Sequence, residues 1–221
     1  MELDAIFTRM VLDNAEKFRN EPAPEPEVVH PQMGFRNGWP ERHSSDLNPD
    51  MDTDWGRAFQ TCSRAISGSG IAILHGKRGT GKTQIAAEVA KQGFYPLDKQ
   101  VKLTSLKRKT AIYKTAMRFF LEIKASYKSK ETTELQIIEG LTECGLLVID
   151  ELQERAETEF ENRILTHVID ARYAANRPTI LIANLTREGL MEHLSRSIVD
   201  RVMETGMRIE CNWDSFRIVK K

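Results

Sequence analysis

The stretch Gly76-Lys-Arg-Gly-Thr-Gly-Lys-Thr83 decides the fold, because it matches the pattern G-x-x-x-x-G-K-[ST] between an apolar run and a predicted helix. Glycines let backbone N–H groups turn inward around phosphates, and the start of a helix adds its positive dipole end. Lys82 is expected to reach the β- and γ-phosphates, and the Thr83 hydroxyl to bind Mg²⁺. The residues predicted to bind ATP are Gly76, Lys77, Arg78, Gly79, Thr80, Gly81, Lys82 and Thr83.

A second apolar run, Leu146-Leu-Val-Ile-Asp-Glu151, ends in two acids. A buried strand would deliver Asp150 to its carboxyl end, beside the phosphate loop, where Asp150 is predicted to hold Mg²⁺ through water. Glu151 is the candidate base that polarises the attacking water.

The run Ile180-Leu-Ile-Ala-Asn184 places another polar residue at the carboxyl end of a predicted strand, the edge at which open α/β sheets bind ligands. Asn184 is expected to orient the lytic water or to contact the γ-phosphate. Further on, Ser195-Arg-Ser-Ile-Val-Asp-Arg201 carries two arginines on a predicted helix, although spacing alone is a weak signal there.

Apolar strands alternate with helical segments, which predicts an α/β domain with a mainly parallel sheet. Strands are expected near 71–74, 101–103, 146–149, 179–183 and 207–211. Helices are expected near 54–66, 82–92, 109–125, 134–142, 159–176, 187–193 and 197–204, and the helix from 159 to have a capping box formed by Thr158 and Glu161.

The N-terminal 50 residues differ from the rest of the chain. Residues 1–20 have helical apolar spacing, and the prolines of 21–27 would end that helix and form a semi-rigid spacer. Because so short a helix must dock somewhere, it either packs on its own domain or serves as a tethered handle for another protein. We expect residues 1–50 to form this helix and linker and residues 51–221 to form the globular domain.

With 40% apolar and 29% charged residues, the 221-residue chain resembles an ordinary globular protein. It has neither a long apolar run nor a secretion signal, so the expected location is the cytoplasm. The three cysteines have no pairing pattern and are expected to be reduced thiols.

Net charge is zero, but basic residues are concentrated between Lys99 and Lys130, where only Glu122 opposes them. Such a segment either contacts a polyanion or is a solvated helix face. The candidate nucleic-acid contacts are Lys107, Lys109, Lys114 and Arg118. Of the aromatic residues among them, Phe119 and Phe120 are expected to pack into the core.

Taken in order, these features resemble the AAA+ ATPases of the DnaC-type bacterial helicase loaders, relatives of the IstB transposition helpers. The likeness covers roughly residues 55–217 and is carried by Gly76–Thr83, Leu146–Glu151, Asp170-Ala-Arg172, Arg177-Pro178, Asn184, Asp200-Arg201 and Asn212-Trp-Asp-Ser-Phe216. The resemblance implies an ATP-controlled protein that self-assembles, binds the replicative hexameric helicase through its N-terminal segment and places it on single-stranded DNA. In that family Asn184 matches the sensor residue, and Arg201 matches the arginine finger that acts on the adjacent subunit.

The sequence also departs from that family. Ser197 occupies the position of a second family arginine, and the N-terminal region is short and shows no clear match, as would suit a loader encoded by a phage or prophage. Only 20 residues follow Arg201, which is too few for a full C-terminal lid. Two other functions stay open: an IstB-like helper acting on a transposase and duplex DNA, and a nucleotide-gated adaptor with negligible turnover.

Overall fold

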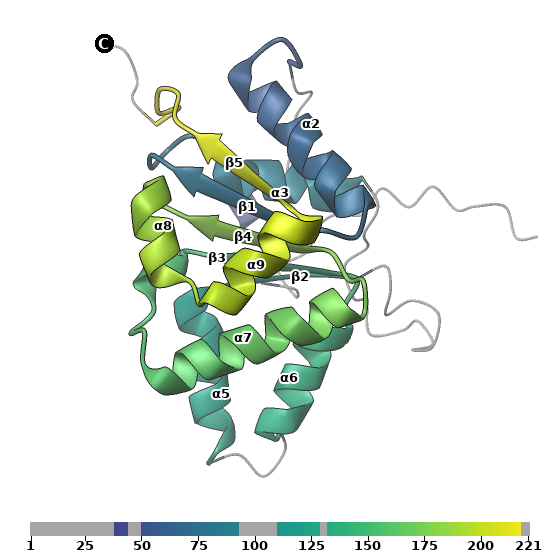
Figure 1. Ribbon diagram of the computed structural model, residues 1–221, viewed down its shortest axis with the longest axis vertical. Coiled ribbons are helices and arrows are strands. Elements are labelled where there is room, and N and C mark those ends of the chain that lie inside the picture. Colours follow the sequence, from purple (N-terminus) through teal and green to yellow (C-terminus); the bar gives the residue numbers. More distant parts are fainter. Residues whose placement is uncertain (1–37, 44–49, 93–109, 129–131, 218–221) are drawn as a thin grey trace, which may run out of the picture. The chain divides into compact units, whose positions relative to one another are not determined.

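The computed structural model describes residues 38–43, 50–92, 110–128 and 132–217. Within them lies a five-stranded sheet of order β2-β3-β4-β1-β5 in which every pairing is parallel (Figure 1). Its strands are β1 (Ile71–Gly76), β2 (Ala111–Thr115), β3 (Leu146–Asp150), β4 (Thr179–Ala183) and β5 (Met207–Cys211). This arrangement confirms the α/β class and the parallel sheet. The expected helix at 1–20, the linker after it and the strand near 101–103 lie outside the described residues.

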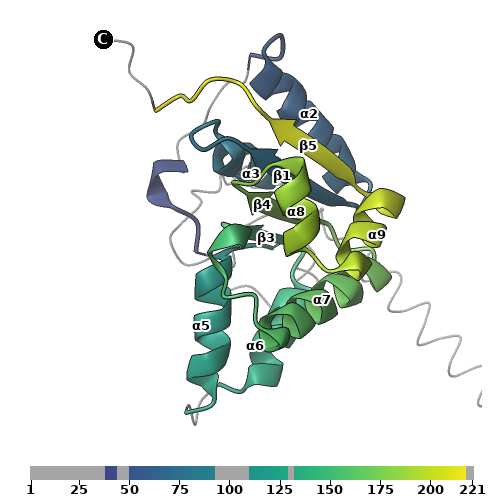
Figure 2. The same ribbon diagram turned by 60° about the vertical axis from the view of Figure 1, so that its left-hand side comes forward.

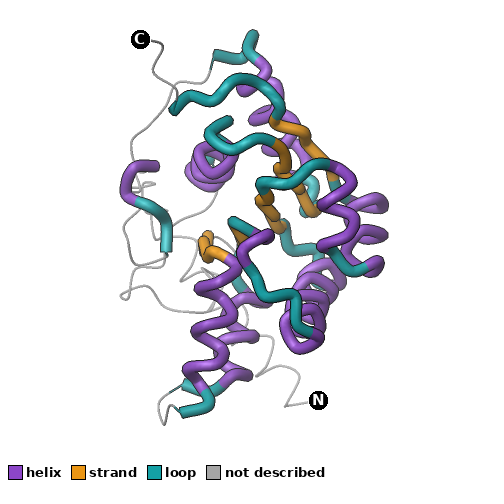
Figure 3. The backbone as a smooth tube through the Cα atoms, turned by 90° about the vertical axis from the view of Figure 1, so that its left-hand side faces the viewer, coloured by secondary structure: helices purple, strands orange, loops and turns teal. Residues whose placement is uncertain are grey.

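Helices cover both faces of the sheet (Figures 1 and 2). One face packs against α2 (Asp54–Ser67) and α3 (Lys82–Lys91). The other packs against α5 (Ala116–Ser126), α6 (Glu134–Glu143), α7 (Glu159–Ala174), α8 (Arg187–His193) and α9 (Arg196–Thr205). Figure 3 shows the strands lying between these helices.

Strands β1 to β4 contribute alternate side chains to two apolar cores, whereas the buried residues of β5, Ile209 and Cys211, belong only to the core under α2 and α3. Along β1, Ala72 and Leu74 join the core under α2 and α3, whereas Ile71 and Ile73 join the opposite one. Because both faces are covered, the central strands are continuous apolar runs, which is why the sequence located them well. Every residue of β3 and of β4 is buried.

The helix expected near 109–125 is wrong in its first part. Residues 111–115 form β2, which pairs with β3 in the register Ala111–Leu146 to Thr115–Asp150, and α5 begins only at Ala116. Thr115 caps α5 by accepting a hydrogen bond from the Arg118 N–H. The β-branched and aromatic residues of 112–115 suit a strand, and pairing with the buried β3 prevails over the helical spacing of the lysines. Phe119 and Phe120 are buried as predicted, with ring centroids 4.6 Å apart.

The predicted capping box at the start of α7 is half formed. Thr158 accepts from the Glu161 N–H, but the Glu161 carboxylate accepts from the Glu157 N–H and not from Thr158. A complete box occurs instead at α6, between Thr133 and Gln136.

Core packing begins upstream of Met51. Trp39 is only 3% exposed and stacks on Tyr113 of β2, at a centroid distance of 5.0 Å. The packed core therefore includes a residue that precedes the boundary expected near residue 51. A single buried tryptophan in a polar stretch gives no periodic signal in the sequence.

Among the described residues, none of the helices combines the length and the apolar character needed to span a membrane.

Candidate nucleotide site

The loop from Gly76 to Thr83 connects β1 to α3 at the carboxyl edge of the sheet. Gly79 and Gly81 have φ of 82° and 79°, which side chains rarely adopt. Gly81 is the N-cap residue of α3, and no side chain caps this end of the helix. The first N–H groups of α3 are therefore available to bind an anion, as the motif predicts.

Lys82 is the buried cation of this loop. Its side chain is directed back across the loop, where Nζ donates to Gly76 O at 3.1 Å, to Lys77 O, and to Thr80 Oγ1 at 3.4 Å. Burial lowers the pKa of Lys82, although the negative charge of the nearby Asp150 acts the other way. The groups that accept hydrogen bonds from Nζ are all neutral. A phosphate beside this ammonium would supply the opposite charge that its hydrogen-bond partners lack.

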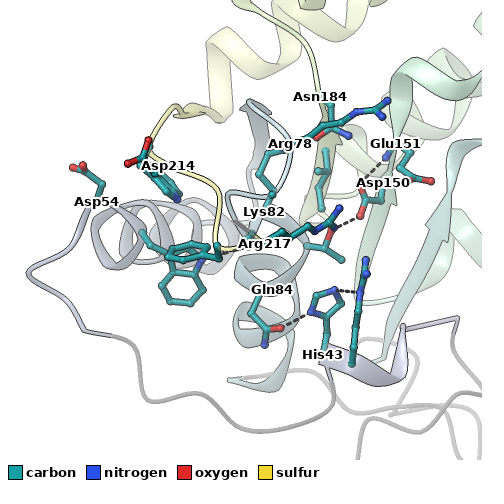
Figure 4. Close-up of a pocket in the computed structure, with 18 of the residues that line it drawn as sticks. His43, Asp54, Arg78, Lys82, Gln84, Asp150, Glu151, Asn184, Asp214 and Arg217 are labelled. Atoms are coloured by element: carbon teal, nitrogen blue, oxygen red, sulfur yellow. Dashed lines mark hydrogen bonds between the residues drawn. The ribbon is translucent and has the colours of Figure 1, made fainter. Parts of the chain in front are cut away.

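Thr83 and Asp150 form a pair of oxygen ligands. The Thr83 hydroxyl donates to Asp150 Oδ2 at 2.6 Å, and Asp150 is 4% exposed at the end of β3 (Figure 4). No group of three or more His, Cys, Asp or Glu side chains among the described residues forms a metal site on its own. Mg²⁺ fits this arrangement, since it is commonly bound by one or two protein oxygens together with waters and substrate phosphates. Thr83 and Asp150 are the residues that would hold it.

Glu151 follows directly and has a left-handed backbone, with φ 56°. Its N–H donates to Asp150 Oδ1 at 2.7 Å, so this turn also fixes the metal-site carboxylate. Partial burial of the carboxyl, followed by the negative charges of Asp150 and Glu154, raises the pKa of Glu151. A raised pKa suits a carboxylate that accepts a proton from water.

Asn184 lies at the end of β4, beside β1 and β3, and lines the same pocket as Lys82 and Glu151. Its N–H donates to Gln153 Oε1 at 2.9 Å. Gln153 belongs to the 3-10 turn η4 (Leu152–Glu154) and was not singled out from the sequence. In the sequence, only the position of Gln153, two residues after Glu151, indicated that it would lie near the site.

The pocket measures about 1000 Å³, and its wall includes residues of the C-terminal tail. Trp213 Nε1 donates to Thr80 O at 3.0 Å, and the Phe216 N–H donates to Gly79 O at 2.9 Å. A Cβ on Gly79 would lie 2.0 Å from Ser215 Oγ. At Gly79 the tail therefore leaves little room for a side chain, in addition to the positive φ of this residue. Sequence analysis noted Asn212–Phe216 as a family signature and assigned it no contact.

The pocket is also lined by residues to which the sequence assigned no role in it, among them Arg42, Trp55 and Tyr113. Figure 4 labels three more of them, His43, Asp54 and Arg217. Trp55 Nε1 lies 3.4 Å from Gly81 O. An aromatic side chain near a phosphate loop carries no sequence motif, so only the folded chain identifies it.

Arg201 is the one predicted catalytic residue that is not in this pocket. It lies on α9, where its guanidinium stacks 4.5 Å from the Tyr173 ring centre and Nε lies 3.5 Å from Asp170 Oδ1. The Ser197 hydroxyl donates to the same Asp170 carboxylate. Ser197, which occupies the position of the second family arginine, thus bonds to Asp170, the carboxylate that also pairs with Arg201.

Two of the candidate nucleic-acid contacts share one carboxylate. Lys114 and Arg118 donate to the Glu122 carboxylate at 2.7–2.9 Å. Partial burial of Glu122 acts to raise its pKa, but these hydrogen bonds and the two positive charges prevail and lower it. Lys107 and Lys109 lie outside the described residues. Nucleic-acid binding by the four residues therefore stays a prediction.

The phosphate loop, the acidic pair after β3 and the polar end of β4 together define a P-loop ATPase. Residues 72–207, more than half of the chain, match the family described as ATPases associated with various cellular activities (AAA). The chain belongs to the AAA family.

Among curated proteins, the chain is similar to the replicative helicase loader DnaC of Escherichia coli strain K12, with 28% identity over 146 residues. That match covers 66% of this chain and 55% of DnaC, so the chain spans little more than half the length of this relative.

Two solved structures share the fold. The crystal structure of the DnaC helicase loader matches 78% of this chain and 99% of its own, with 14% identity and a TM-score of 0.56. AMPPCP-bound DnaA from Aquifex aeolicus matches 82% of this chain and 52% of its own, with 20% identity and a TM-score of 0.58.

Proposed function

We propose that this protein is an ATP-dependent loader that binds a replicative hexameric DNA helicase in the cytoplasm and delivers it onto single-stranded DNA. The observation that carries the proposal is its similarity to the replicative helicase loader DnaC. A second feature agrees with it: the tail that resembles those loaders packs on the phosphate loop through Trp213 and Phe216.

In this proposal the phosphate loop binds ATP, and Thr83 and Asp150 hold Mg²⁺, which would neutralise charge on the phosphates. Lys82 binds the phosphates, Glu151 accepts the proton of the attacking water and Asn184 orients that water. Arg201, which does not line the pocket of its own chain, completes the site of an adjacent subunit in an assembly of copies. The ATP would then control assembly on DNA.

The N-terminal segment is the proposed helicase contact, and the basic residues near α5 are the proposed DNA contacts. Lys114 and Arg118 are partly neutralised by Glu122, and the Arg118 side chain is 74% exposed. Coulombic contacts of this kind bind the backbone of a single strand without sequence preference, and their strength falls with salt.

The deciding experiment is co-purification of the tagged full chain with the replicative helicase of the organism that encodes it. We expect the full chain to retain the helicase, and residues 28–221 to lose it while binding a fluorescent ATP analogue as before. The nucleotide measurement controls for folding of the truncated chain. Retention of the helicase by residues 28–221 would show that the N-terminal segment is not the contact.

Turnover separates the loader from a transposition helper. A loader is expected to hydrolyse ATP slowly, and faster with single-stranded than with duplex DNA. Stimulation by duplex DNA together with a transposase, and no helicase retained by the full chain, would contradict the loader.

A further inference from the structure

A short segment upstream of α2, Gly38 to His43, lies against the nucleotide pocket. It ends in the 3-10 turn η2 (Glu41–His43), which lies beside α3 (Figure 2). The segment precedes the domain expected from the sequence, and no motif marks it. It contacts Tyr113, which in turn bonds to the Asp150 carboxylate, and it contacts α3, the helix that follows the phosphate loop.

The first contact is a stack on β2. The Trp39 ring lies 5.0 Å from that of Tyr113, with the planes tilted by 35°. Gly38 has φ 84°, and a Cβ there would lie 2.2 Å from Tyr113 O, so the backbone itself packs on the strand. This close approach, together with the burial of Trp39, fixes the segment on Tyr113.

Tyr113 in turn holds the metal-site carboxylate. Its hydroxyl, buried at 5% exposure, donates to Asp150 Oδ2 at 2.8 Å, the same oxygen that accepts from Thr83. Burial and the adjacent negative charge of Asp150 raise the pKa of Tyr113, so the phenol remains a neutral donor at physiological pH. Outer-shell donors of this kind orient metal-binding carboxylates.

The second contact is a relay of hydrogen bonds to α3. Arg42 Nε donates to His43 Nε2 at 3.1 Å, and His43 Nδ1 bonds to the Gln84 side-chain oxygen (Figure 4). Because Nε2 accepts, Nδ1 carries the proton, and His43 is neutral; burial also lowers the pKa of His43. Gln84 Nε2 donates to Glu88 at 2.7 Å, which anchors the relay on α3.

This relay uses only one donor of the Arg42 guanidinium. With the described residues, its terminal nitrogens form no hydrogen bond, and no carboxylate lies within ion-pair distance of them. By contrast, Arg78, which also lines the pocket, is paired with Glu154. Arg42 lines the pocket together with Lys82 and Glu151, the groups assigned to the terminal phosphate and its hydrolysis. A planar fork with free donors at this position is suited to phosphate oxygens.

We propose that Gly38–His43 forms a further wall of the nucleotide site, in which Arg42 binds the terminal phosphate of ATP within the same chain and Tyr113, supported by Trp39, positions Asp150 for Mg²⁺. The inference rests on the proposed binding of ATP and Mg²⁺ and is independent of the helicase.

The test for Arg42 measures the affinity of the full chain for fluorescent analogues of ATP and ADP with Mg²⁺ present. Arg42→Ala is expected to weaken ATP binding about tenfold or more, since a charge-assisted hydrogen bond is lost, and to change ADP binding little. Arg42→Lys should restore part of the affinity. Arg163→Ala is the control, because Arg163 is 75% exposed and pairs only with Glu159 among the described residues. Unchanged ATP affinity in Arg42→Ala overturns this assignment.

The test for Tyr113 measures how much Mg²⁺ is needed to raise the affinity for the ATP analogue. Tyr113→Phe keeps the stack on Trp39 and removes the donor, so we expect about tenfold more Mg²⁺ at half effect, with binding in EDTA and the thermal melting temperature unchanged. An unchanged Mg²⁺ requirement overturns the positioning role. If the unaltered protein itself binds neither analogue, the proposed function fails first, which separates the two failures.

Discussion

At the scale of single residues, Glu151 combines a strained backbone with a place in the nucleotide pocket. A non-glycine residue with φ 56° costs on the order of 1–3 kcal/mol and persists only where its surroundings enforce it. Here the enforced turn directs the Glu151 N–H onto Asp150 and leaves the Glu151 carboxyl in the pocket, near a second acid. The strained turn therefore gives the two adjacent carboxylates different surroundings, which suits their proposed roles as metal ligand and base.

The raised pKa of Glu151 gives a prediction for the pH dependence of ATP turnover. Only the carboxylate form accepts a proton, so turnover is lost as the pH falls through a pKa that lies above that of an ordinary glutamate. Glu154→Gln removes one of the like charges that raise this pKa and also releases Arg78 from its ion pair. Both changes lower the pKa, so the acidic limb of the rate profile should move to lower pH.

Glu139→Gln is the matched control, since Glu139 is exposed on α6, away from the pocket residues. If the acidic limb of the rate profile of Glu154→Gln stays in place or moves to higher pH, ionisation of Glu151 does not determine that limb.

At the scale of elements, Arg172 connects α7 to the end of α6 and to the start of β4. Its side chain is fully buried and donates to Leu141 O and Cys144 O at the end of α6 and to Pro178 O before β4, at 2.6–2.9 Å. Nε also donates to Thr179 Oγ1 at 2.8 Å. A cation at the carboxyl end of a helix is favoured by the helix dipole, and these acceptors replace the water that burial removes.

Replacing Arg172 with Met should therefore destabilise the fold by about 3 kcal/mol or more, because several buried carbonyls lose their donor at once. Urea unfolding followed by circular dichroism measures this change. Arg163→Met, on the exposed face of the same helix, should stay within about 0.5 kcal/mol of the unaltered protein. Equal stabilities of the two variants would mean that Arg172 is not a structural clamp.

At the scale of the whole molecule, the described residues place Lys82, Asp150, Glu151 and Asn184 in one pocket and Arg201 outside it. Arg201 is held on α9 by Tyr173 and Asp170, on an element packed against α7 and β1. An arginine fixed in this way acts on ATP only if that ATP belongs to another copy.

Mixing two inactive variants tests this arrangement. Arg201→Ala should reduce assembled turnover roughly 100-fold or more, and Lys82→Ala should abolish nucleotide binding. In a mixture, the Lys82→Ala copy supplies its intact Arg201 to a neighbour with an intact phosphate loop, so turnover should exceed that of either variant alone.

Arg196→Ala is the control for this experiment, because Arg196 lies on the same helix with 95% of its side chain exposed. Its turnover alone should equal that of the unaltered protein. No recovery of turnover in any mixture, with assembly intact, would contradict action between subunits.

The sequence by itself determined the phosphate loop, the acids after β3 and the order of most elements. These features are local: a helix start, a Gly-rich turn and apolar strands buried on both faces are each encoded in a few consecutive residues. The threonine cap Thr158 likewise marked the start of α7.

Only the tertiary structure decided what surrounds that loop. The strand at 111–115 depends on pairing with β3, the tail contact joins Trp213 to Thr80, and the upstream wall joins Trp39 to Tyr113. Each of these contacts connects residues far apart in the chain, so no local pattern encodes them. The sequence located the predicted phosphate loop, and packing of distant segments decided which side chains enclose it.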